Sequence, residues 1–225
     1  MRVTKQLTLL IITSMTLILS SCSSEESMLT NEVPTNKLLK SFTVKKDANG
    51  AYSLNFDLNS DAVVDKTYND YSKTSQFVLY SSNKPGVRNV KESMSINDSK
   101  LQIGFVDTNT DEKPSITIVD DNITFGKGDT EALQSFEISS VDDSAYQLDF
   151  TVKDDITAKF VYNEDLDTYE VHLDGGKSDT SFYTVMFDKE EGKKLRIDFL
   201  NYNENEESKA RAVQAIRKPK IIIDD

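Results

Sequence analysis

The 225-residue chain has one cysteine, one histidine and no tryptophan. A single cysteine cannot form an internal disulfide or a cysteine-rich metal cluster, and a single histidine cannot supply a multi-histidine zinc or iron site. Basic residues are fewer than acidic ones: the chain has 26 lysines and arginines and 38 acidic residues, which gives a net charge of −12. Nucleic acid is bound through clustered basic side chains, so this composition argues against nucleic acid as a partner. We expect no cofactor.

The first 21 residues follow the order of a secretory signal. Arg2 and Lys5 precede an apolar run from Leu7 to Leu19, and small residues follow it. This run is too short to cross a bilayer, because a membrane-spanning helix needs about 20 apolar residues. We therefore interpret residues 1–21 as a signal peptide that is removed after export.

Cys22 stands directly after this segment. The sequence Leu19-Ser20-Ser21-Cys22 resembles the lipobox of bacterial lipoproteins, in which the cysteine is acylated and becomes the first residue of the mature protein. The only thiol of the chain occupies this position. The resemblance implies lipidation at Cys22, with two or three acyl chains that anchor the protein stably to a membrane.

Residues 22–37 are predicted to form a flexible acidic and polar tether. Glu25 and Glu26 follow the cysteine closely, and this acidic cluster resembles the export signal of surface lipoproteins of Bacteroidota. The resemblance implies an outer-membrane lipoprotein that faces the medium. A lipoprotein that faces the periplasm is the alternative.

The remainder of the chain is an internal repeat. Residues from 38 onward match residues from 132 onward at a constant offset of 94, so that the pattern at 52–56 recurs at 146–150. The shared residues are mainly apolar and alternate with polar ones, which indicates strands with one buried face. We place the first repeat at 38–121, a linker at 122–131 and the second repeat at 132–225.

Seven strands are predicted in the first repeat, and the asparagine and glycine before residue 51 favour a tight hairpin turn. The predicted strands span 39–45, 51–58, 62–68, 76–81, 89–96, 101–107 and 115–120. This number and spacing fit an immunoglobulin-like β-sandwich, although the cysteine and tryptophan hallmarks of that fold are absent. The sequence therefore predicts an all-β protein with two tandem immunoglobulin-like β-sandwiches that fold independently. A β-meander or a small barrel is the alternative.

The second repeat has an insertion before its last strand. Acidic residues begin this segment and Arg217 stands near its end, an order that the helix dipole favours. The sequence predicts one short helix over 204–218. Either its Val213 and Ile216 cover an open sheet edge, or its Arg211 and Arg217 form a surface for an acidic partner.

No arrangement of catalytic residues is evident in the sequence. His172 lies in a predicted strand, lacks a nucleophile motif nearby, and is interpreted as a solvent-facing strand residue. Adjacent carboxylates such as Asp120-Asp121 and Asp154-Asp155 point to opposite faces of a strand, whereas a glycosidase pair must converge on one cleft. We interpret them as turn and strand-end residues that keep the surface soluble. We expect that the protein is not an enzyme.

Two runs of oxygen ligands, at 57–61 and 107–111, resemble the opening of a calcium loop. Neither run has the glycine and the glutamate that complete an EF-hand. We interpret them as polar turns and assign no metal ligand, although a weak loop calcium site stays open.

Two further features concern sugars. Asp143-Ser144-Ala145 resembles the O-glycosylation motif of exported Bacteroidota proteins, which makes Ser144 a candidate modification site in a predicted turn. Tandem sandwiches on a surface lipoprotein are similar in layout to the Sus-type glycan-capture lipoproteins of Bacteroidota. Without tryptophan, however, only exposed tyrosines could stack on a sugar. Tyr68 is interpreted as a core or corner residue rather than such a platform.

These features predict a lipid-anchored binding or adhesion module of the cell envelope that does not transform its ligand. It is expected at the outer membrane, exposed at the cell surface, with the membrane as one partner and a protein or glycan as the other. A structural accessory subunit of an outer-membrane complex is the alternative. A glycan-binding protein or a glycan hydrolase is a more distant one.

Overall fold

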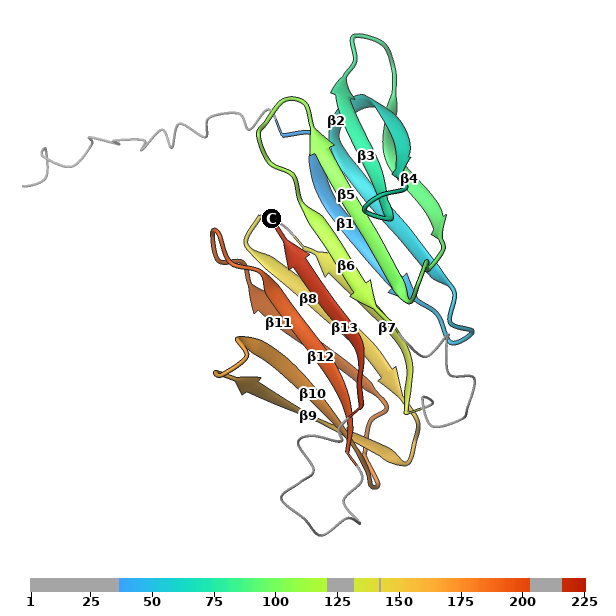
Figure 1. The fold of residues 1–225 in the computed structure, drawn as a ribbon, viewed down its shortest axis with the longest axis vertical. Coiled ribbons are helices and arrows are strands. Elements are labelled where there is room, and N and C mark those ends of the chain that lie inside the picture. Colours follow the sequence, from blue (N-terminus) through green and yellow to red (C-terminus); the bar gives the residue numbers. More distant parts are fainter. Residues whose placement is uncertain (1–36, 121–131, 142, 203–215) are drawn as a thin grey trace, which may run out of the picture. The chain divides into compact units, whose positions relative to one another are not determined.

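A computed structural model describes residues 37–120, 132–141, 143–202 and 216–225, and these residues form an all-β fold (Figure 1). The described strands are β1 (Leu39–Lys46), β2 (Tyr52–Asn69), β3 (Thr74–Ser81), β4 (Val87–Met94), β5 (Lys100–Asp107), β6 (Ser115–Val119), β7 (Leu133–Ser140), β8 (Ala145–Val152), β9 (Ile156–Asn163), β10 (Thr168–Gly175), β11 (Phe182–Asp188), β12 (Leu195–Tyr202) and β13 (Ile216–Asp224). The all-β prediction is confirmed. In the first repeat every predicted strand is present, and the second and third are joined in the long strand β2.

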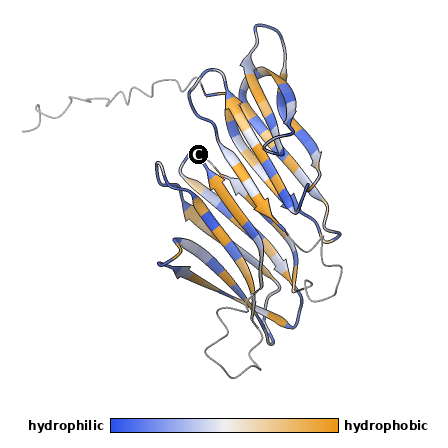
Figure 2. Ribbon diagram, in the orientation of Figure 1, coloured by the Kyte–Doolittle hydropathy of each residue, from blue (hydrophilic) through white to orange (hydrophobic). Residues whose placement is uncertain are grey.

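The second repeat reproduces the strands of the first. β7 and β10 lie 94 residues after β1 and β3, as the sequence offset requires. The one difference in continuity is at β2, whose two halves correspond to the separate strands β8 and β9. Polar and apolar residues alternate along the strands of both repeats (Figure 2). The same alternation therefore produces corresponding strands in the two repeats.

The strands of both repeats hydrogen bond to one another in a single sheet. Its order is β11-β8-β7-β1-β2-β3-β5-β6-β13-β12-β10-β9, and β4 pairs with the free side of β2. β1 pairs antiparallel with β7, and β6 pairs antiparallel with β13, so two ladders join the repeats. The expectation of two separate immunoglobulin-like sandwiches is not confirmed.

The sheet curls into two layers because β2 takes part in both. Residues 52–58 of β2 pair with β1, and residues 62–69 pair with β3. We call β4, β2, β1, β7, β8 and β11 the first layer, and β3, β5, β6, β13, β12, β10 and β9 the second layer. Ring contacts between strands that are not neighbours in the sheet show that the layers face each other. The buried apolar side chains of both repeats belong to one core.

The two repeats meet with approximate twofold symmetry. Val44 of β1 pairs with Ile138 of β7, which is its own counterpart in the second repeat. The ring contacts across the junction are reciprocal as well, since Phe42 meets Tyr146 at 6.2 Å between centroids and Tyr52 meets Phe136 at 6.1 Å. An isologous contact of this kind covers the edge strands that each repeat alone would leave unpaired. Edge pairing is the physical reason that the repeats share one sandwich.

The predicted helix is not confirmed. Residues 203–215, including Val213 and Arg211, lie outside the described residues. The end of the predicted segment, 216–218, is in strand β13. Pro219 also lies in this strand, where the pairing with β12 shifts register between Asp198 and Leu200. Such an irregularity accommodates a proline, because a proline has no N–H to donate to the ladder.

Gly86 permits a close approach of the chain to β2 just before β4. A Cβ atom at this position would lie 2.3 Å from the carbonyl oxygen of Ala62. We expect Gly86→Ala to lower the free energy of unfolding by about 1 to 3 kcal/mol, because the backbone must move to relieve the overlap. The matched control is Gly104→Ala, whose Cβ would meet only Thr74 at 3.6 Å. Equal urea midpoints for the two variants would contradict this reading of Gly86.

Candidate functional site

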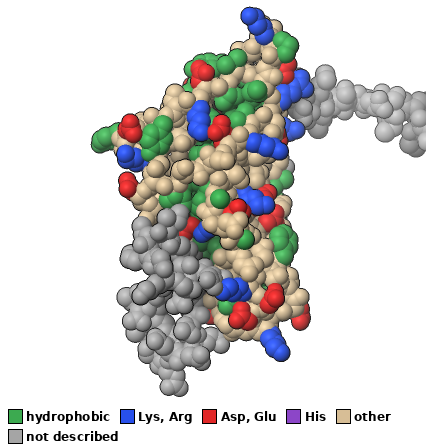
Figure 3. Space-filling model, turned by 90° about the vertical axis from the view of Figure 1, so that its right-hand side faces the viewer, with side chains coloured by type: hydrophobic (Ala, Val, Ile, Leu, Met, Phe, Trp, Pro, Cys, Tyr) green, Lys and Arg blue, Asp and Glu red, His purple; other side chains and the backbone are tan. Residues whose placement is uncertain are grey.

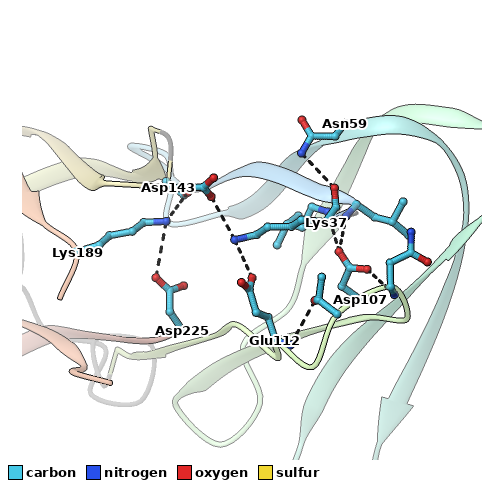
Figure 4. Close-up of polar contacts among 12 residues, drawn as sticks. Lys37, Asn59, Asp107, Glu112, Asp143, Lys189 and Asp225 are labelled. Carbon is cyan, nitrogen blue, oxygen red and sulfur yellow. Dashed lines mark hydrogen bonds and ion pairs between the residues drawn. The ribbon is translucent and has the colours of Figure 1, made fainter. Parts of the chain in front are cut away.

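The chain enters the sandwich at Lys37, at the junction of the two repeats (Figure 4). The Lys37 ammonium lies 2.7 Å from the Glu112 carboxylate, in the loop between β5 and β6. It also lies 3.2 Å from Asp143, in the turn between β7 and β8. Burial lowers the pKa of Lys37, but the two carboxylates outweigh that effect and the pKa is raised overall. Lys37 therefore ties the start of the fold to both repeats.

Asp107 fixes the backbone that follows Lys37. Its buried carboxylate accepts hydrogen bonds from the backbone N–H groups of Leu38 and Leu39, and from that of Asn109 at 2.9 Å. Asn59 donates from its side-chain amide to the carbonyl of Lys37 at 3.2 Å. The polar residues at 107 and 59 thus bind the incoming chain. Asn59 lies within strand β2, so the expectation of a polar turn at 57–61 is wrong, whereas Asp107 ends β5 and the rest of its run enters the turn that follows.

The carboxylates of the first candidate calcium run contact other side chains of the protein. In the first run, Asp61 pairs with Arg88 at 2.7 Å and Asp57 accepts a hydrogen bond from Asn89. Among the described residues, no group of three or more His, Cys, Asp or Glu side chains is arranged to hold a metal ion.

Asp120 differs from the surface carboxylate that the sequence suggested, because it is completely buried. The Tyr52 hydroxyl donates to its Oδ2 at 2.7 Å, and the Lys46 ammonium lies 2.5 Å from the same oxygen. The tyrosine belongs to the first layer, whereas the aspartate directly follows β6 of the second layer. Asp120 is therefore a polar connection between the layers. Its neighbour Asp121 lies outside the described residues.

The second repeat has the same connection. Tyr146 is the counterpart of Tyr52, and its hydroxyl donates to Asp225, which follows β13. Lys189 supplies the cation, at 3.7 Å from Asp225 and with its ammonium 4.6 Å from the centre of the Tyr146 ring. We call these two arrangements the tyrosine-aspartate clasps. Both connect the layers close to the repeat junction.

A pocket lies between the layers beside the second clasp. Both layers contribute to it, from the loop after β11 and from the facing ends of β9, β10 and β12. Four acidic and four basic side chains line it, together with three tyrosines. We call it the tyrosine pocket, and its lining includes Tyr162, Asp167, Tyr169, Glu190, Lys193 and Arg196.

Two of its tyrosine rings are exposed and held in place. Tyr162 is 48% exposed and Tyr169 is 37% exposed, and their ring centroids are 5.0 Å apart. The Tyr162 hydroxyl donates to Asp167 at 2.6 Å. The Tyr169 ring packs edge-on against the buried ring of Phe187 at 4.8 Å. Both rings are therefore fixed before any ligand arrives, which lowers the entropy cost of binding.

No family model, curated protein or solved structure matches the chain. The internal repeat supplies a comparison of its own. In the first repeat the counterparts of Tyr169 and Arg196 are Ser75 and Gln102, and the counterpart of Asp167 is Lys73. The repeats therefore share a core and a clasp but not the tyrosine pocket.

Tyr68, the counterpart of Tyr162, is exposed at the end of β2. The interpretation of this position as a core residue is wrong, although it does stand at a corner beside a turn. The sequence signal that could have located the pocket is the pair Tyr162 and Tyr169. Only the antiparallel pairing of β9 and β10 places these residues directly opposite each other.

The hydrogen bond to Asp167 has a measurable consequence for Tyr162. It is the main cause that raises the pKa of this phenol to about 12. We expect one tyrosine of the folded protein to titrate near this value in ultraviolet absorbance, and Asp167→Asn to bring it back toward about 10, the ordinary value. A titration unchanged by Asp167→Asn would exclude this hydrogen bond in solution.

His172 is not the solvent-facing residue that the sequence suggested. Its side chain is only 16% exposed, and its Nε2 lies 2.8 Å from the Glu170 carboxylate. Glu170 and the neighbouring Asp198 are buried on adjacent strands, opposite each other in the register of β10 and β12. The burial of these carboxylates could not be predicted from the sequence, because an alternating strand pattern assigns polar residues to the solvent side.

Ser144 does not line the tyrosine pocket. Ser144 is exposed in the turn before β8, next to Asp143. Arg217 lies in β13, opposite Leu200 of β12. Cys22 and Arg211 lie outside the described residues. Within the described part of the chain, no helix is long and apolar enough to span a membrane.

Proposed function

We propose that the protein is a lipid-anchored, non-catalytic binding module of the outer membrane and that the tyrosine pocket holds its ligand. The observation that carries this proposal is the pair of exposed rings, Tyr162 and Tyr169, fixed at the mouth of a pocket whose lining differs from the corresponding residues of the first repeat. Concave sites with aromatic walls and a few converging polar groups are the usual form of ligand sites. Rigid tyrosines supply contact area at a low entropy cost.

The contacts of the titratable side chains support a non-catalytic role. His172 is paired with Glu170 and lies on a strand of the second layer. The carboxylates of Asp107 and Asp120 bind backbone amides and a clasp tyrosine. A working acid and base must reach one substrate atom together. These contacts leave the groups with structural roles instead.

The proposed anchor is the acylated Cys22, with residues 22–37 as tether and residues 1–21 removed as signal peptide. The ion pairs of Lys37 with Glu112 and Asp143 fix the chain where it enters the fold, which supports a tether at this end. Surface exposure is part of the proposal, and so is O-glycosylation at Ser144, whose turn is accessible. We expect neither nucleic acid nor a cofactor to bind.

Lipidation is tested with Cys22→Ser. We expect the wild-type protein, grown with a labelled fatty acid, to carry the label and to fractionate with membranes. The variant should accumulate as an unlabelled precursor. A labelled and membrane-bound variant would exclude acylation at Cys22.

The pocket is tested with purified protein and with polysaccharide and protein fractions of the bacterial envelope. We expect one of these fractions to bind the wild-type protein and to bind Tyr169→Ser, which restores the residue of the first repeat, at least fivefold more weakly. The melting temperature of the variant checks its fold. Undiminished binding to Tyr169→Ser, or no binding of any fraction, would contradict a ligand site at the tyrosine pocket.

A structural accessory subunit of an outer-membrane complex is the second candidate. It is favoured by Phe182 and Met186, which are exposed on the edge strand β11. An acidic partner at Arg211 and Arg217 would fit the same role. Protease treatment of intact cells separates the two proposals, because a surface module is cleaved and a subunit enclosed in a complex is protected.

A further inference from the structure

The tyrosine pocket has no excess of either charge. Four carboxylates, including Asp167 and Glu190, and four cationic side chains, including Lys193 and Arg196, line it together. The chain as a whole has a net charge of −12, so this balance is local. Acidic and basic side chains are also intermixed over the molecular face drawn in Figure 3. A strongly charged ligand would gain from one half of the lining and be opposed by the other half.

The pocket contains hydrogen-bond donors and hydrogen-bond acceptors side by side. Lys193 is paired with Glu190 in the loop after β11, and Arg196 lines the pocket from β12. Lysine and arginine side chains only donate hydrogen bonds, and ionised carboxylates only accept them. A hydroxyl group can do both at once. A ligand with several neighbouring hydroxyls can therefore satisfy both kinds of group without carrying a charge.

The two tyrosines add an apolar surface to this polar lining. The rings of Tyr162 and Tyr169 are inclined at 47° to each other, so they form a shallow angle rather than one flat platform. Apolar C–H groups pack well on aromatic faces. A ligand that fits this pocket therefore has one apolar face, and it carries hydroxyl groups along its own edge.

The size of the pocket limits how such a ligand can bind. The pocket is small and partly open, with a cavity volume of about 60 Å³. Pockets that enclose a drug-sized ligand measure about 300 to 1,000 Å³. A ligand can therefore insert only one edge, while the rest of it lies over the tyrosine rings.

From these four features we infer that the tyrosine pocket binds the terminal pyranose unit of an uncharged glycan. The hydroxyls at one edge of the ring enter between Asp167, Glu190, Lys193 and Arg196, and the apolar ring face packs on Tyr162 and Tyr169. This inference rests on the proposed function, because it names the ligand class of the same pocket. The absence of tryptophan is no obstacle, since two tyrosines here share the stacking surface.

The test is isothermal titration of the purified chain with neutral hexasaccharides of glucose, mannose, galactose and xylose, and with a galacturonic acid hexamer as the charged probe. We expect at least one neutral hexamer to bind and the charged hexamer to bind more weakly. Tyr169→Ser and Arg196→Gln, which restore the residues of the first repeat, should each weaken binding by about five- to tenfold. Tyr71→Ala, an exposed tyrosine outside the pocket, should leave the affinity unchanged.

Three results would overturn the inference. The first is that no neutral hexamer binds. The second is that the galacturonic acid hexamer binds most tightly. The third is that Tyr71→Ala weakens binding as much as Tyr169→Ser does. If a protein fraction of the envelope bound the wild-type chain and not Tyr169→Ser while every hexasaccharide failed, the binding function would stand and the glycan assignment would be wrong.

Discussion

Phe105→Ala is expected to lower the free energy of unfolding by about 3 to 5 kcal/mol, the range for a buried phenylalanine replaced by alanine. The Phe105 ring is almost fully buried and meets the rings of Phe42, Phe56 and Phe77 at 5.9, 5.1 and 5.8 Å. These contacts join both layers, so the cavity cannot be filled by movement of one strand alone. Urea denaturation measures the loss.

The matched control for this substitution is Phe182→Ala. Phe182 is exposed on the outer face of β11, and we expect its replacement to change stability by no more than about 0.5 kcal/mol. If both variants unfolded at the same urea concentration, the two-layer core would not be the main source of stability.

Asp120→Ala is expected to cost about 3 to 5 kcal/mol, because it breaks a buried ionic contact by removing one partner. The Lys46 ammonium is largely buried and would lose its carboxylate, and the Tyr52 hydroxyl would lose its acceptor. Tyr52→Phe removes only the hydroxyl and should cost about 1 to 3 kcal/mol. The control is Asp154→Ala, in the exposed turn before β9, which should be nearly neutral. A small effect of Asp120→Ala would show that the clasp is formed weakly or not at all.

The clasps also predict how stability changes with pH. Burial is the largest cause that raises the pKa of Tyr52 and of Tyr146, and the nearby carboxylates of Asp120 and Asp225 raise it further. The folded protein therefore keeps both phenols protonated, whereas the unfolded chain releases these protons near pH 10. The stability that the protonated phenols contribute is therefore fully present below pH 10. As the pH rises above 10, the free energy of unfolding falls by about 1.4 kcal/mol per pH unit for each tyrosine. Tyr52→Phe should reduce this alkaline slope, and an unchanged slope would contradict the clasp.

The strands were predictable from the sequence because their signal is local. Alternation along Tyr52, Leu54 and Phe56 marks a buried face whatever the strand pairs with. The repeat offset carried the same assignment to Tyr146, Leu148 and Phe150, which are buried as well. The joining of two predicted strands into β2 was not visible, since Asn59 and Ser60 resemble turn residues and only pairing with β1 and β3 keeps the strand continuous.

The sharing of one sandwich by both repeats could not be read from linear spacing. The pattern of a strand does not reveal which strand it pairs with. The backbone of β1 at Val44 could equally well pair with a strand of the other repeat or remain at an open edge of the sheet. The tyrosine pocket was beyond the sequence for a similar reason. It combines residues from β9, β10 and β12 with the loop after β11, and only the arrangement of the two layers brings them together.

The central claim is that both repeats form one cooperative sandwich, and differential scanning calorimetry of residues 23–225 tests it most directly. Phe105 and Phe199 are counterparts in the two repeats and are both buried. We predict a single transition whose calorimetric and van't Hoff enthalpies agree, and which Phe105→Ala and Phe199→Ala each shift downward by about 6 to 20 °C. Two separate transitions, one moved only by Phe105→Ala and the other only by Phe199→Ala, would contradict the shared core.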